Sequence, residues 1–168
     1  MYSVFYSKYP AFMNLLEKAG LYNAKLYDFP FLIKGELYTI FVPSDQALAD
    51  YRADTLPKEE LAAFLRYHFI KGEKIFTDNK KPAKQYETLR KDESSTQYTT
   101  YFSTINIRPG PDVIDILDKN GNLYISIPEK EGKTNIMIAY DLDPESDDET
   151  DFIITGVVHQ IDTVLIKQ

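Results

Sequence analysis

The stretch from Thr155 to Ile166 constrains the fold of this chain more than any other. It is apolar, rich in β-branched residues and bounded by polar sequence, which predicts a strand. Its aliphatic residues do not alternate strictly, as expected for a strand that is irregular or buried on both faces. His159 and Asp162 interrupt it. Such a polar pair either satisfies buried backbone groups or takes part in chemistry.

Helical periodicity is confined to the first part of the chain. Apolar residues recur at helical spacing from Tyr9 to Ala19, which predicts a helix that Ser7 caps and Gly20 ends. The following segment is irregular, but Phe29 to Leu32 is too apolar for a free linker. We expect it to pack against the core.

A strand is predicted from Leu37 to Val42, since Pro43 cannot donate to a β-ladder. Ser44 or Asp45 is then expected to cap a short helix. A longer helix follows Pro57 and is predicted to extend to Gly72. Its apolar stripe places His68 on the buried face. The residues of that stripe are Leu61, Phe64, Leu65, His68 and Phe69.

The rest of the chain reads as strands and turns. Asn120-Gly121 between two β-branched runs predicts a hairpin. Helices early and strands late favour an α+β domain with antiparallel sheets over alternating βαβ units. We expect one domain over residues 1–168. The predicted strands are 75–77, 86–89, 98–108, 113–117, 123–127, 135–140 and 152–154.

Charge and composition exclude several classes of partner and site. The net charge of −7 argues against nucleic acid and against an anionic membrane surface. The absence of cysteine removes disulfides, thiolate nucleophiles and Cys-based zinc sites. No window is apolar enough to span a membrane, and the N-terminus lacks a signal pattern. Met1 fits the start of a mature or internal fragment, and in that case any export signal or lipid anchor would lie outside this sequence.

Three candidate sites follow from the titratable residues. His68 and His159 could share a metal, but no acidic residue lies at ligand spacing on the helix of His68 and there is no H-E-x-x-H pattern, so we expect core imidazoles bonded to backbone or carboxylate. Asp45 and Asp162 could form an acid–base pair, although the first is at a capping position. The acidic run from Asp141 to Asp151 alternates like a calcium loop but lacks the glycine and the final glutamate. We therefore expect a solvated loop, and no metal, cofactor or catalytic residue.

Three stretches together resemble the fasciclin domain family. They are Tyr38 to Ala47, Leu65 to Gly72 and Gly156 to Leu165, and they occur in the order and spacing of that family. This chain departs from the family pattern at Thr155, where asparagine is frequent, and in the apparent insertion 141–151. The motif positions in these stretches are Thr39, Phe41, Pro43, Asp45, Gly156, His159 and Asp162.

The resemblance implies a wedge of two antiparallel β-sheets with a cluster of helices in the N-terminal half. It implies a non-enzymatic adhesion or scaffold module, extracellular or at a cell surface, of the bacterial, lipid-anchored kind. Its partners would be proteins or polysaccharides, and a tandem domain is conceivable in a longer protein. By resemblance, Tyr67 and His68 are candidates for partner contact. A carbohydrate-binding module of a surface glycan-handling system is the alternative.

Overall fold

The computed structural model describes residues 8–26, 29–33, 35–141 and 152–167. The elements in these ranges are α2 (Pro10–Lys18), β1 (Leu37–Pro43), α3 (Asp45–Tyr51), the 3₁₀ helix η1 (Ala53–Thr55), α4 (Lys58–Arg66), β2 (Phe69–Lys71), β3 (Lys84–Lys91), β4 (Phe102–Gly110), β5 (Val113–Leu117), β6 (Leu123–Pro128), β7 (Ile136–Asp141) and β8 (Phe152–Ile161). All described helices precede residue 67, as the sequence predicts for an α+β chain.

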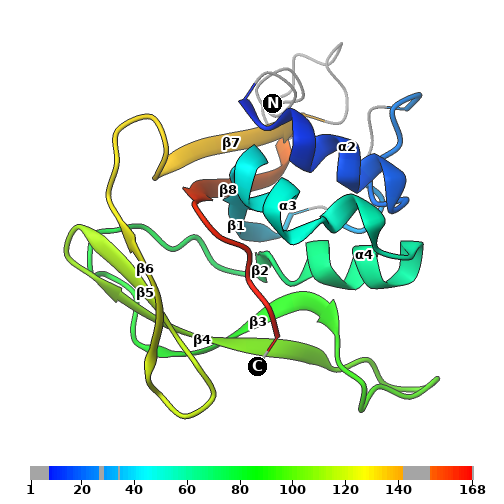
Figure 1. Cartoon of the computed structure of the whole chain (residues 1–168). Coiled ribbons are helices and arrows are strands. Elements are labelled where there is room, and N and C mark those ends of the chain that lie inside the picture. Colours follow the sequence, from blue (N-terminus) through cyan, green and yellow to red (C-terminus); the bar gives the residue numbers. More distant parts are fainter. Residues whose placement is uncertain (1–7, 27–28, 34, 142–151, 168) are drawn as a thin grey trace.

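The strands pair in the order β6-β5-β4-β3-β2-β1-β8-β7. β2 and β3 are paired at one position only, where Ile70 lies opposite Thr88. The sheet therefore has two halves, one built from β1, β2, β7 and β8 and the other from β3 to β6. In Figure 1 the helices lie over the first half, while β4, β5 and β6 form a separate layer below it. This arrangement confirms the α+β fold with helices in the N-terminal half.

One pairing corrects the expectation of antiparallel sheets. β1 and β8 run parallel, with Leu37 opposite Thr155 and Pro43 opposite Ile161. Antiparallel order is set by short hairpins, and no hairpin joins the first strand to the last. β8 instead enters between β1 and β7 from the far end of the chain, so local turn chemistry does not fix its direction.

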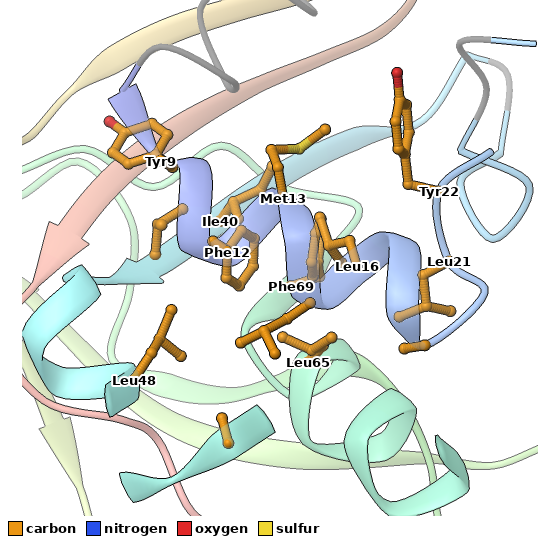
Figure 2. Close-up of a cluster of buried hydrophobic side chains, with 14 of the residues drawn as sticks. Tyr9, Phe12, Met13, Leu16, Leu21, Tyr22, Ile40, Leu48, Leu65 and Phe69 are labelled. Carbon is orange, nitrogen blue, oxygen red and sulfur yellow. The ribbon is translucent and has the colours of Figure 1, made fainter. Parts of the chain in front are cut away.

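Two clusters of buried side chains lie on opposite faces of the first half of the sheet. In one cluster, α2 packs against β1 and α4, and the ring centroids of Phe12 and Phe69 are 6.1 Å apart. Figure 2 shows Phe12 and Leu16 of α2 beside Phe69 and Leu65. In the other cluster, Phe41 and Ile161 pack on the isoleucines of β4 and β5. β1 and β8 are thus buried on both faces, which explains the lack of strict alternation in the closing stretch.

The helices begin for identifiable local reasons. Pro10 occupies the first turn of α2, where its missing N–H costs nothing, and Ser7 lies outside the described residues. Ser44 caps α3, since its Oγ accepts a hydrogen bond from the Ala47 N–H at 3.1 Å. Phe29 is buried, which confirms that the apolar segment 29–32 packs onto the core.

Two predicted elements are wrong in their extent or type. The helix after Pro57 ends at Arg66, and Phe69 begins β2, so Gly72 ends a strand rather than a helix. Residues 75–77 do not form a strand. The Ile75 N–H donates to the Thr39 hydroxyl and the Thr77 N–H to the Asn135 side chain. Side chains thereby satisfy the backbone groups that a ladder would have used.

The predicted hairpin of 113–117 and 123–127 is confirmed as β5 and β6. Its turn differs in detail, since Gly121 alone takes a positive φ and the Asp118 carboxylate accepts the N–H groups of Asn120 and Asn122. No described helix is long and apolar enough to cross a membrane. Asp141 ends β7, and residues 142–151, where the calcium hypothesis falls, lie outside the described residues.

Candidate functional site

His68 lies between α4 and β2 and is fully buried. Its Nε2 accepts a hydrogen bond from the Leu165 N–H at 2.9 Å, so the proton resides on Nδ1, which donates to the Phe64 carbonyl at 2.9 Å. The ring therefore joins the end of α4 to the segment that follows β8. Burial disfavours the imidazolium and lowers the pKa of His68 to about 4, so the ring is neutral at neutral pH.

His159 plays the corresponding role from β8. Its Nε2–H donates to the Ile75 carbonyl at 2.7 Å, and its Nδ1 accepts from the Asn135 N–H at 3.2 Å. The ring also stacks on Phe41, with 5.7 Å between centroids. Burial lowers its pKa to about 4 as well. The prediction that both histidines satisfy buried backbone groups is confirmed.

Asp162 does not belong to this set of buried polar groups, and its predicted place in the closing strand is wrong. β8 ends at Ile161 because its partner β1 ends at Pro43, and Asp162 is exposed in the bend that follows. Asp45 is exposed in the first turn of α3. The two carboxylates line different depressions, so they do not form a pair. Among the described residues, no three His, Asp or Glu side chains gather as a metal site would need.

Thr39 is a structural polar residue of β1. Its side chain is buried, and Oγ1 donates to the Glu73 carbonyl at 2.7 Å and accepts from the Ile75 N–H at 2.9 Å. The hydroxyl fixes the irregular chain after Gly72 against the sheet. His159, on the same face of the sheet, holds the same segment through the Ile75 carbonyl.

Replacing Thr39 with valine should lower the free energy of unfolding by about 2 kcal/mol, since two buried backbone groups lose their partner. Urea unfolding followed by circular dichroism measures the loss. Thr39→Ser keeps the hydroxyl and is the matched control. Equal losses in the two variants would contradict the role of the hydroxyl.

The other motif residues of β1 and β8 are buried in the sheet. Phe41 belongs to the second core cluster, and Pro43 is the last residue of β1. Gly156 lies between Tyr38 of β1 and Ile138 of β7. A Cβ on Gly156 would lie 2.9 Å from the Tyr38 carbonyl oxygen, so glycine is needed here for space.

Tyr67, the first residue after α4, lines a small pocket. The pocket has a volume of about 160 Å³ and lies where β3 and β4 meet the C-terminal segment. Polar side chains surround it, and Tyr67 itself is 3% exposed. His68 does not line the pocket, but it holds Leu165 in the segment that carries Lys167. The polar side chains that line the pocket with Tyr67 are Gln85, Asp92, Thr104, Asn106, Lys119 and Lys167.

Ion pairs join one side of this pocket to the loop between β3 and β4. Glu93 pairs with Arg90 at 2.6 Å and with Lys167, and these two contacts lower its pKa to about 2. Lys167 also lies 3.4 Å from Asp92. The pKa of Asp92 is lowered mainly by hydrogen bonds from the Ser94 hydroxyl and backbone N–H. The C-terminal segment is thus tied to the base of this loop.

The loop itself, residues 92–101, is ordered by its own side chains. The Thr96 hydroxyl accepts the N–H groups of Tyr98 and Thr99, and Ser95 exchanges two hydrogen bonds with the backbone of Tyr101. Tyr98 is 88% exposed and Tyr101 is 53% exposed. Figure 1 shows this loop projecting beyond the sheet between β3 and β4. The chain therefore presents two tyrosines on a preorganised projection.

The sequence prediction missed this feature because it extended the strand back to Tyr98. β4 begins at Phe102, since Ser and Thr side chains in the loop compete with the ladder for the backbone groups before it. The run Ser94-Ser95-Thr96 was the available signal. Tyr67 and His68, by contrast, have buried side chains, and their contact with a partner stays a prediction.

Comparison with known proteins places the chain in a family. The Fasciclin domain matches residues 7–126, which include two of the three stretches named from the sequence. No curated protein matches. Among solved structures, the chain is similar to a FAS1 domain pair from the insect cell adhesion molecule Fasciclin I, with 15% identity and a TM-score of 0.42. That match covers 93% of this chain and 45% of the other, so the chain spans less than half of the domain pair. Because the family match extends over well more than half of the 168 residues, the chain belongs to the fasciclin domain family.

Proposed function

We propose that this fasciclin domain is a non-catalytic adhesion module that binds a protein or matrix partner through the loop 92–101. The observation that carries the proposal is the exposure of Tyr98 and Tyr101 on a loop held by internal hydrogen bonds. Tyrosine is enriched at the centres of protein interfaces, because its ring buries a large area and its hydroxyl bonds the partner. A loop already ordered before binding loses little conformational entropy. Family membership supports the adhesion role.

The side chains that could do chemistry are engaged elsewhere, which supports a non-catalytic role. Each histidine uses both ring nitrogens on backbone groups. A general base needs a free nitrogen that reaches a substrate proton. The module would act outside the cell or at its surface. Lipid anchoring, bacterial origin and a neighbouring tandem domain stay predictions.

A carbohydrate-binding module is the second candidate, and the pocket beside Tyr67 favours it. Gln85, Thr104 and Asn106 offer amide and hydroxyl groups of the kind that bond sugar hydroxyls. The two candidates place the ligand on neighbouring surfaces but use different side chains, so mutation separates them.

The double variant Tyr98→Ala/Tyr101→Ala should weaken binding to matrix proteins at least about tenfold, since each aromatic anchor contributes on the order of 1–2 kcal/mol. Binding is measured by surface plasmon resonance on the matrix proteins that wild type recognises in an array. Tyr124→Ala is the matched control, because Tyr124 is 40% exposed on β6, away from the loop.

An unchanged affinity in the double variant would reject the loop as the binding site. Glycan-array binding that is lost in Asn106→Ala and retained in the tyrosine variant would favour the carbohydrate candidate instead. Thermal unfolding of each variant checks that the fold is intact. We expect little change for the tyrosine variants, because their side chains are largely exposed.

A further inference from the structure

β6 is a terminal strand of the sheet with an unprotected edge. Within the described part of the chain it pairs only with β5. Its sequence, Leu123 to Pro128, contains no charged residue. In natural proteins such edges usually carry charged residues, which disfavour pairing of the unpaired backbone groups with a strand of another chain. Apart from Pro128 at its end, β6 has no such protection.

The register shows which backbone groups of β6 are free. The two-residue hairpin at Pro111-Asp112 makes Gly110 and Val113 a hydrogen-bonded pair, so Ile114 and Ile116 bond to β6. The backbone N–H and C=O groups of Ile125 and Ile127 therefore bond to β5, and those of Ser126 point away from β5 toward the open edge. The Pro128 carbonyl points the same way. An added strand would find a donor and two acceptors along this edge.

A groove lies against the same strand. It has a volume of about 230 Å³, with Ile125 to Pro128 on one side and Gln160 to Thr163 on the other. Ile127 and Ile161 are buried at its base. It therefore offers apolar contacts for side chains and backbone groups for a main chain, which together suit an extended peptide.

The charge of the groove points to the kind of peptide. Lys130 and Lys133 line one end and form no side-chain hydrogen bond or ion pair with any described residue. Asp162 is the single acidic residue in the lining, so the two lysines outnumber the carboxylates that line the groove, while Glu129 and Glu131 lie beside Lys130 outside the lining. A second copy would add another β6, which has no carboxylate to meet the lysines. An acidic segment of a different protein fits better.

We propose that β6 and its groove bind an extended, acidic segment of a partner protein, which adds as a strand to the β6 edge. Main-chain hydrogen bonds to Ser126 and Pro128 would give affinity, and Lys130 and Lys133 would select carboxylates. This surface is distinct from the loop 92–101, so the two binding proposals can fail separately.

The test uses the whole chain and a short fluorescent peptide of alternating valine and glutamate. Binding is followed by fluorescence anisotropy at low and high salt. Ser126→Pro removes the outward N–H and keeps the backbone bonds of Ile125 and Ile127 to β5, but it loses the hydrogen bond from the Ser126 hydroxyl to Asp115. Ser126→Ala is its matched control because it loses the same hydroxyl and keeps the N–H. Lys130→Glu/Lys133→Glu tests the charge, with Lys58→Glu, at an exposed position in the first turn of α4, as its control.

We expect the peptide to bind wild type, Ser126→Ala and Lys58→Glu alike, and the proline and double-glutamate variants at least about tenfold more weakly. Three results would overturn the proposal. One is no binding of the peptide by wild type. Another is equal binding by Ser126→Pro and Ser126→Ala, provided that both unfold at similar temperatures. The third is self-association of wild type that Ser126→Pro abolishes, since the edge would then take a second copy.

Discussion

Replacing Gly156 with valine is expected to destabilise the domain by roughly 3 kcal/mol or more. Even a Cβ at this position would lie 2.9 Å from the Tyr38 carbonyl oxygen, which belongs to the parallel neighbour and cannot move without disturbing β1. Overpacking in a tight interior costs about 1–3 kcal/mol, and the branched side chain adds to it. Gly156→Ala should fall in that range. Urea unfolding measures both.

Gly110 provides the matched control for this prediction. Neither Gly156 nor Gly110 has a positive φ that would require glycine. A Cβ added at Gly110 would lie 3.2 Å from Cγ1 of Val113, a side-chain atom that can rotate. Gly110→Ala should therefore cost less than Gly156→Ala. If the two alanine variants lose the same stability, the close approach of β1 and β8 does not explain the glycine.

The sequence predicts those elements whose cause is local. The apolar stripe of α4, the Ser44 cap of α3 and the hairpin of β5 and β6 each depend on residues a few positions apart. Elements fixed by distant partners were missed or misjudged. Residues 75–77 look like a strand, yet Thr39 and Asn135 satisfy their backbone groups from elsewhere in the chain.

The same distinction holds for the candidate site. The burial of both histidines follows from their apolar neighbours, but the most distant partner of each lies 97 or 84 residues away, at Leu165 for His68 and at Ile75 for His159. Asp162 looked equivalent to His159 because both interrupt the same apolar stretch. It is exposed because β1 stops at Pro43, a limit set by the partner strand rather than by the closing stretch itself.

Acidification should destabilise the domain steeply before its carboxylates titrate. The pKa of each buried histidine is about 4 in the folded chain and about 6.5 when unfolded. The unfolded chain therefore binds protons that the folded chain refuses, and stability falls as pH drops from about 6.5 toward 4. Each histidine can remove about 3 kcal/mol over that window. Together they reach the total stability of a small domain.

The effect is assigned to the histidines by comparing urea unfolding at about pH 7 and pH 5, a range above the usual carboxylate pKa values. His68→Gln can keep an acceptor near the Leu165 N–H, and His159→Gln a donor near the Ile75 carbonyl, but neither titrates. Each variant should lose about half of the pH dependence of wild type, whatever its stability at pH 7. His68→Phe and His159→Phe should show the same flattening at lower stability, since they leave backbone groups unpaired. If the free energy of unfolding of every variant changes between pH 7 and pH 5 as much as that of wild type, other groups cause the pH dependence and the neutral buried imidazoles are not its source.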